Sequence, residues 1–218
     1  MRKLTGLFLM AIVILSSGCF EILEEIKQNS DGSGHFSYLV NMSQSRDKIN
    51  AILKLDSAGG LRIPKQTDID QRINIGKQAV AGVNGITNVQ VKSDYDQYIF
   101  SISFDFDSLE TMNRAAAVLH EELSPYGTTY FDLFTTTSTG FTRHADAHTT
   151  AFLANLKRKN PAMLKSAKYT TVYRFDRMVS TEDNHARVAG NQRAIMYQKS
   201  VSEIAQNTTL LEQHIHYK

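Results

Sequence analysis

The stretch Tyr98-Ile99-Phe100-Ser101-Ile102-Ser103-Phe104-Asp105-Phe106 carries the clearest secondary-structure signal in the chain. Large apolar side chains occupy every second position, and most of the residues between them are polar. Because successive side chains of a strand point to opposite faces, this period predicts a β-strand with four aromatic residues on one face. Val89 and Val91 precede it across a turn at 93–96, so we expect a β-hairpin here.

Three amphipathic helices are predicted around this hairpin, over 45–56, 67–83 and 107–123. In the second, apolar residues and Gly76 recur at spacings of 4, 3, 4 and 3, and Thr67 is the expected N-cap. The third begins with a pattern of Asp and Glu at 107 and 110 that is similar to a capping box.

Further strands are expected on both sides of this central part. Residues 21–42 predict a hairpin around the turn-forming stretch Asn29–Gly34, and a fourth helix is expected over 146–159. The other expected strands lie at 127–142, 169–175, 186–189, 193–199 and 209–217. Strands in runs with grouped helices favour an α+β fold, with a mainly antiparallel sheet packed against amphipathic helices, over a doubly wound parallel sheet.

The composition is that of an ordinary globular chain. Of 218 residues, 42% are hydrophobic and 21% are charged, which excludes a long disordered chain and a disulfide-stapled miniprotein. The formal net charge of +2 gives no case for a nucleic-acid partner, which requires a basic excess on one face.

Residues 1–18 have the layout of a secretory signal peptide. Arg2 and Lys3 form a positive start, residues 4–15 are mostly apolar, and Ser16, Ser17 and Gly18 are small. The next residue, Cys19, is the only cysteine in the chain. We therefore expect residues 19–218 to form a single mature domain without an internal disulfide.

Leu15-Ser16-Ser17-Gly18-Cys19 resembles the lipobox of bacterial lipoproteins, although Ser16 stands where the family usually has Leu, Val or Ile. The resemblance implies cleavage before Cys19, a diacylglycerol on its sulfur and a further acyl chain such as palmitate on its amine. Two or more chains give stable anchoring. The protein is thus expected in the cell envelope, held to a bacterial membrane by this lipid, with the inner or outer membrane left open.

A second resemblance covers the early mature chain. A lipoprotein cysteine followed directly by a strand, the turn Asp31-Gly32-Ser33-Gly34 and a second strand is similar to the lipoprotein domains of the LppM type. This resemblance implies an α+β lipoprotein domain that binds lipid or an envelope glycolipid, and it implies no particular site residues.

His144, Asp146 and His148 are the candidate metal ligands. On a helix, His144 and His148 would share a face at i, i+4, which suits a transition metal, but three or four ligands are needed and solvated surface histidines are the competing interpretation. His214 and His216 would share one face of a strand in the same incomplete way.

Two sets of charged residues each allow a functional and a structural interpretation. The aspartates at 94, 96, 105 and 107 suit an acid/base pair or a calcium site, but they also suit turns and a helix cap. The basic run Lys157-Arg158-Lys159, with Lys165 and Lys168, suits anionic lipid headgroups or a solvated helix end.

The aromatic face predicted over 98–106 also has two interpretations. It would either line a ligand cavity or form part of the hydrophobic core.

Nucleophile elbows, phosphate-binding loops and dinucleotide fingerprints are absent from the sequence, so no catalytic residue is assigned and no cofactor is expected. The predicted function is non-catalytic binding of a lipid, a glycolipid or another envelope protein. Two alternatives remain open. One is an envelope hydrolase or metal-dependent enzyme that uses His144, Asp146 and His148, and the other is a structural subunit of an envelope complex.

Overall fold

The computed structural model describes residues 20–218 except 56, 59–60, 124–131, 146 and 160. Its helices are α2 (Arg46–Leu53), α3 (Gln66–Ala81), α4 (Leu109–Leu123), α5 (Ala147–Lys159), α6 (Pro161–Leu164) and α7 (Val201–Ile204), with 3₁₀ turns η2 (Ser43–Ser45) and η3 (Thr208–Leu211). Its strands are β1 (Glu21–Gln28), β2 (Gly34–Asn41), β3 (Ser57–Ala58), β4 (Leu61–Arg62), β5 (Ile86–Asp94), β6 (Ile99–Phe106), β7 (Phe134–Thr136), β8 (Gly140–Arg143), β9 (Lys168–Phe175), β10 (Val179–Ser180), β11 (Arg187–Val188), β12 (Ala194–Ser200) and β13 (Gln213–Tyr217).

A seven-stranded sheet forms the centre of the fold, in the order β11-β12-β9-β1-β2-β6-β5. Its neighbouring strands are antiparallel except β1 and β9, which run parallel. The two hairpins predicted from the sequence, β1–β2 and β5–β6, are confirmed. The α+β class is confirmed as well, with a sheet that is antiparallel apart from this one pair.

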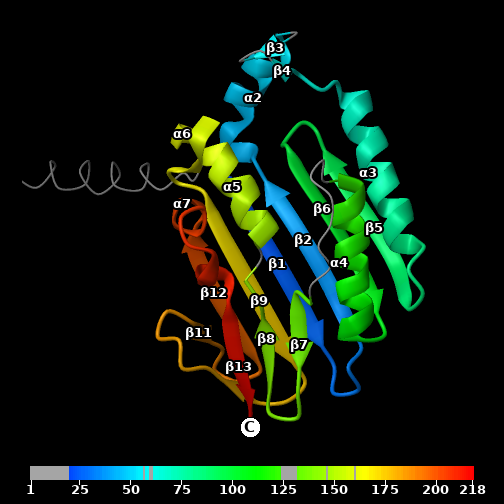
Figure 1. Cartoon of the computed structure of the whole chain (residues 1–218), viewed down its shortest axis with the longest axis vertical. Coiled ribbons are helices and arrows are strands. Elements are labelled where there is room, and N and C mark those ends of the chain that lie inside the picture. The colour runs from blue at the N-terminus through cyan, green and yellow to red at the C-terminus, as the bar shows by residue number, and fades with distance from the viewer. Residues whose placement is uncertain (1–19, 56, 59–60, 124–131, 146, 160) are drawn as a thin grey trace, which may run out of the picture.

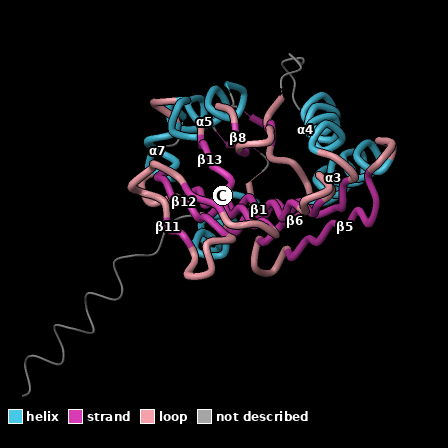
Figure 2. The backbone as a smooth tube through the Cα atoms, turned by 90° about the horizontal axis from the view of Figure 1, so that it is seen from below, coloured by secondary structure: helices cyan, strands magenta, loops and turns pink. Residues whose placement is uncertain are grey.

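Helices and a second sheet pack on the same side of the large sheet (Figure 2). α3 and α4 lie over the half that contains β5 and β6 (Figure 1). The other half is covered by α5, α7 and a four-stranded sheet in the order β10-β13-β8-β7. The inward-facing residues of the large sheet therefore pack against these elements, including Ile86 of β5 and Ile195 of β12.

The apolar core has two parts. The larger lies between the big sheet, α4 and the four-stranded sheet, and it contains the aromatic side chains of Phe104, Phe106, Phe134 and Phe141. The aromatic face predicted from the alternating stretch at 98–106 thus packs inward. The smaller part lies between the sheet and α5–α7, and it is built around Phe20 with Leu153, Leu164, Tyr169, Val201 and Ile204.

The fold begins immediately after Cys19. Phe20 is buried in the smaller core, and its carbonyl oxygen accepts a hydrogen bond of 3.1 Å from the Lys168 backbone N–H. Consecutive Cα atoms are only ~3.8 Å apart, so no flexible tether separates residue 19 from the packed domain. Cys19 itself, like the predicted leader, lies outside the described residues.

Several helix ends differ from the sequence prediction. Asp68 accepts the Lys65 N–H at 2.9 Å, so α3 begins at Gln66 and Thr67 is not its N-cap. At α4 the Ser108 hydroxyl accepts the Thr111 N–H, and the predicted pairing of Asp107 with Glu110 is wrong. Further along, α7 begins with a capping box formed by Ser200 and Glu203, where a loop was expected. Asn207 caps the 3₁₀ turn η3, which takes up the start of the strand expected at 209–217.

We predict that Phe20→Ala lowers the free energy of unfolding by about 3–5 kcal/mol, because it removes a buried aromatic ring and leaves a cavity in the smaller core. Urea denaturation followed by circular dichroism measures the change. Ile52→Ala is the matched control, since Ile52 is exposed and its truncation is expected to change the stability by less than about 0.5 kcal/mol. Equal losses for both variants would contradict the placement of Phe20.

Candidate functional site

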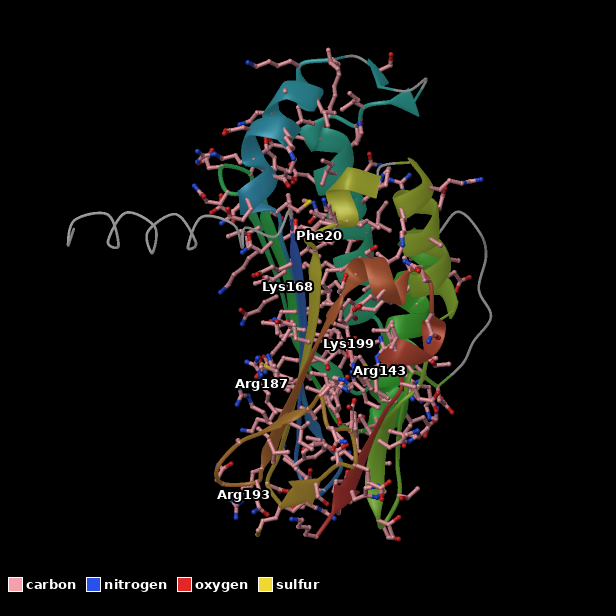
Figure 3. All side chains as sticks on the ribbon, turned by 90° about the vertical axis from the view of Figure 1, so that its left-hand side faces the viewer. Phe20, Arg143, Lys168, Arg187, Arg193 and Lys199 are labelled. Carbon is pink, nitrogen blue, oxygen red and sulfur yellow. The ribbon has the colours of Figure 1, made fainter. Side chains whose placement is uncertain are left out.

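A buried ion pair joins the large sheet to the four-stranded sheet. Glu24 of β1 is 2% exposed and Arg143 of β8 is 1% exposed. The Arg143 Nη2 lies 3.3 Å from Glu24 Oε2, and its Nε lies 3.5 Å from Oε1. The remaining Nη1 donates to the carbonyl oxygen of His144 at 2.7 Å, and Figure 3 shows Arg143 between the two sheets.

Two tyrosines of β9 complete the coordination of this carboxylate. Tyr173 donates to Glu24 Oε1 and Tyr169 to Oε2, both at 2.8 Å. The parallel register makes this possible, because it places Ile22, Glu24 and Ile26 beside inward-facing residues of β9. A buried carboxylate needs this many donors to offset the loss of water.

The pKa values follow from this arrangement. Burial raises the pKa of Tyr169 and of Tyr173 well above the usual value, and the neighbouring Glu24 carboxylate raises both further. Burial alone would lower the pKa of Arg143, but the charge of Glu24, the interactions of Arg143 with Tyr169 and Tyr173 and its hydrogen bond to Glu24 together more than compensate, and the pKa is raised. These raised pKa values keep Arg143 charged and both tyrosines protonated as hydrogen-bond donors at neutral pH, and we assign the cluster the role of joining the sheets.

Glu24 is not among the site residues expected from the sequence, although the sequence carries a signal for it. Ile22 and Ile26 are inward-facing residues of one strand, and Glu24 lies midway between them on the same face. A carboxylate in the middle of an apolar face must have a buried partner. The sequence alone does not say that this partner is Arg143, which is 119 residues away along the chain.

We predict that Glu24→Gln lowers the free energy of unfolding by about 3–5 kcal/mol, because it leaves the Arg143 guanidinium buried without a counter-ion. Equilibrium denaturation in urea measures the loss. Glu25→Gln is a close control, because Glu25 lies on the opposite face and its 2.6 Å pair with Arg174 is partly exposed, so a loss below about 1 kcal/mol is expected. Similar small losses in both variants would show that the Glu24 pair does not join the sheets.

Alkaline pH should unfold the protein through the same cluster. The folded pKa values of Tyr169 and Tyr173 lie above the unfolded value of about 10, so their contribution to stability is complete below about pH 10 and is lost as the pH rises above that value through the folded pKa values. Denaturant titrations between neutral and strongly alkaline pH, with tyrosinate absorbance, measure this. Tyrosines that all ionised near pH 10 without loss of structure would contradict the burial.

An apolar groove of about 230 Å³ lies between α3 and the inward face of the sheet. Its apolar side chains are half-buried, which leaves a contiguous hydrophobic surface beneath the helix. They come from β2, β5, β6, α3 and α4 and comprise Tyr38, Val40, Ile73, Val91, Phe100, Ile102 and Leu119. Part of the aromatic face predicted at 98–106 therefore lines a cavity, and the rest is core.

The groove exists because α3 packs unevenly on the sheet. Gly76 and Val80, in the second half of the helix, are buried, whereas Ile69 and Ile73 in the first half are only partly buried. A hydrogen bond of 2.6 Å from the Tyr95 hydroxyl to Asp70 ties the first half to the β5–β6 turn. Burial, together with this bond to a carboxylate, raises the pKa of Tyr95 to about 12.

Three exposed cations line the same groove, Arg72 and Lys77 of α3 and Lys92 of β5. Arg72 also borders a second, more polar hollow of about 530 Å³, together with Gln71 of α3 and Glu122 of α4. An amphiphile with its apolar part in the groove would therefore have its head next to the three cations of the groove and to a hollow of mixed charge, which includes the carboxylates of Asp68 and Glu122.

The candidate metal ligands are only partly described. His144 follows β8, and its Nε2 lies 2.8 Å from the Thr135 hydroxyl. Because α5 begins at Ala147, His144 and His148 do not share a helical face. Asp146 lies outside the described residues, as does the side chain of His148, so this site stays a prediction. Within the described part of the chain, no group of three His, Cys, Asp or Glu side chains could hold a metal ion.

The other candidate groups are engaged in structural contacts. His214 and His216 share the exposed face of β13 as expected. Asp94 accepts the Gln97 N–H at one end of the β5–β6 hairpin, whereas Asp105 binds His35 and Asn88 at the other end, so the four aspartates are not brought together.

The remaining motifs also have local roles. In the stretch Asn29–Gly34, the Asn29 N–H bonds to the Ser33 carbonyl, which makes it the predicted turn. In the basic run, the Lys157 ammonium donates to the Ser202 carbonyl at 3.0 Å and Arg158 donates to the Asn155 side chain. These two cations therefore hold elements of the protein itself.

Comparison with known proteins gives one structural likeness. No protein-family model and no curated protein matches the chain. Among solved structures, it is similar to the NMR structure of the folded domain of LppM from Mycobacterium tuberculosis, with 10% sequence identity and a TM-score of 0.44. The alignment covers 93% of this chain and 90% of that one. In the part of the chain that the structure describes, no helix is both long and apolar enough to span a bilayer.

Proposed function

We propose that this chain is a lipid-anchored protein of the bacterial cell envelope that binds an anionic amphiphile, with one apolar chain of the ligand in the groove beneath α3. The lipobox-like residues before Cys19 support the anchor, and the packing of Phe20 directly after it supports a domain held close to the membrane. The observation that carries the binding role is the half-buried apolar lining of the groove.

The volume of the groove fits one hydrocarbon chain of a ligand. An apolar cavity of ~150 Å³ already accommodates benzene. Pockets for whole drug-sized ligands span ~300–1,000 Å³, so about 230 Å³ suits a segment of a single hydrocarbon chain, with the head outside. Each methylene that enters the groove removes apolar surface of the ligand and of the protein from water. Burial of one methylene stabilises the complex by ~0.8 kcal/mol.

The charges around the groove support an anionic head. Arg72, Lys77 and Lys92 are all exposed, and they line the groove without a carboxylate among its other described lining residues. Exposed ion pairs contribute only ~0.2–1 kcal/mol each, so the cations select the sign of the head while the apolar contact supplies most of the affinity.

We predict that the chain from Gly18 onward, carrying Cys19→Ser, binds the fluorescent fatty acid cis-parinaric acid. Ile73→Trp fills the groove and should weaken binding by at least about tenfold, which corresponds to ~1.4 kcal/mol. The enhancement of parinaric acid fluorescence on titration measures the affinity.

Val188→Trp is the matched control, because Val188 of β11 is exposed and lines neither the apolar groove nor the second hollow. Equal affinities for the two tryptophan variants would rule out the groove as the binding site. Arg72→Ala/Lys77→Ala should weaken binding of the acid, by less than about tenfold, and leave its methyl ester unaffected. A loss for both probes would contradict the role of charge.

A further inference from the structure

A second apolar surface lies on α2 and the residues after it. Ile52, Leu53 and Leu55 are 46%, 43% and 52% exposed, and no side chain of α2 is buried. Ile49, Ile52 and Leu53 share one face of the helix. Figure 1 shows α2 and the β3–β4 hairpin projecting beyond the end of the large sheet. We call the described residues between 46 and 65, which are 46–55, 57–58 and 61–65, the projection.

The projection is basic, whereas the chain as a whole is not. From Phe20 to the C-terminus, 22 basic residues balance 22 acidic ones. Within 46–65, five basic residues stand against the acidic residues Asp47 and Asp56, for a formal net charge of +3. The basic residues of the projection are Arg46, Lys48, Lys54, Arg62 and Lys65.

The projection begins next to the point where the chain leaves residue 19. Glu21, at the start of β1, pairs with Asn41, at the end of β2, and the antiparallel register keeps their Cα atoms within ~5.5 Å. Figure 3 shows Phe20 at the base of the projection. The eight residues of α2 extend about 12 Å at 1.5 Å per residue, and Asn50 in this helix accepts a hydrogen bond from the Tyr98 hydroxyl at the β5–β6 turn.

We propose that the projection is a membrane-contact element, with a bilayer containing anionic lipid as its partner. Ile52, Leu53 and Leu55 enter the boundary between headgroups and acyl chains, and Lys48 and Lys54 contact anionic headgroups. Apolar faces of interfacial helices are buried ~5–10 Å deep in this way, and their affinity combines apolar area with charge. This contact orients the domain next to its N-terminal lipid anchor. The proposed membrane contact does not require a ligand in the groove.

The chain contains no tryptophan, so a single introduced tryptophan reports on its own surroundings. In the chain from Gly18 onward with Cys19→Ser, Leu53→Trp should show a blue-shifted emission when vesicles of equal parts phosphatidylcholine and phosphatidylglycerol are added. Val188→Trp is the matched control, because Val188 is similarly exposed on β11, and its emission should not change. No shift at position 53, or the same shift at both positions, overturns the proposal.

Vesicle sedimentation gives an independent readout. Ile52→Ser/Leu53→Ser/Leu55→Ser should lower the partition coefficient by about tenfold or more, whereas Met178→Ser/Val188→Ser, which removes similarly exposed apolar side chains elsewhere, should leave it unchanged. Lys48→Glu/Lys54→Glu should lower binding to the anionic vesicles. An unchanged partition coefficient for the triple variant overturns the proposal. A parent chain that stays in the supernatant also overturns it, and that result is the one expected of a surface that binds a protein partner.

Discussion

The Glu24 carboxylate lies between the two sheets and accepts hydrogen bonds from Tyr169, Tyr173 and Arg143, which reach it from β9 and β8. A buried charge is tolerated only with such partners, so the parallel β1–β9 pairing and the position of the four-stranded sheet must form together. This constraint fixes the half of the molecule that carries α5, α7 and the second sheet. It also fixes Phe20, whose carbonyl bonds to the first residue of β9.

The other half of the large sheet is covered more loosely. The second half of α3 buries Gly76 and Val80, and its first half is held by the hydrogen bond between Tyr95 and Asp70 above an apolar surface that remains half-exposed. The groove results from this difference in packing. The basic projection starts at the end of β2, the strand that supplies Tyr38 and Val40 to the groove, so the proposed ligand site and the proposed membrane contact share one strand. A domain that accepts an amphiphile near a bilayer would need both.

Local periodicity in the sequence predicted most strands and helices correctly, because alternation over 98–106 and the spacing along α3 reflect which faces are buried. It did not predict the parallel pairing of β1 with β9, since nothing in either segment specifies a partner about 150 residues away. The groove was anticipated only as one use of the aromatic face. Its shape depends on how far α3 stands from the sheet, which is set by tertiary contacts such as Tyr95 with Asp70.

The most direct test of the account is an amide NMR titration of the ¹⁵N-labelled chain, from Gly18 onward with Cys19→Ser, with lauric acid below its micelle-forming concentration. Binding beneath α3 predicts shift changes concentrated at the groove, at Val40 of β2, Ile73 of α3 and Phe100 of β6, with the amides of β11 and β13 unaffected. Changes centred on β11 or β13, or no changes at all, would contradict an amphiphile site beneath α3.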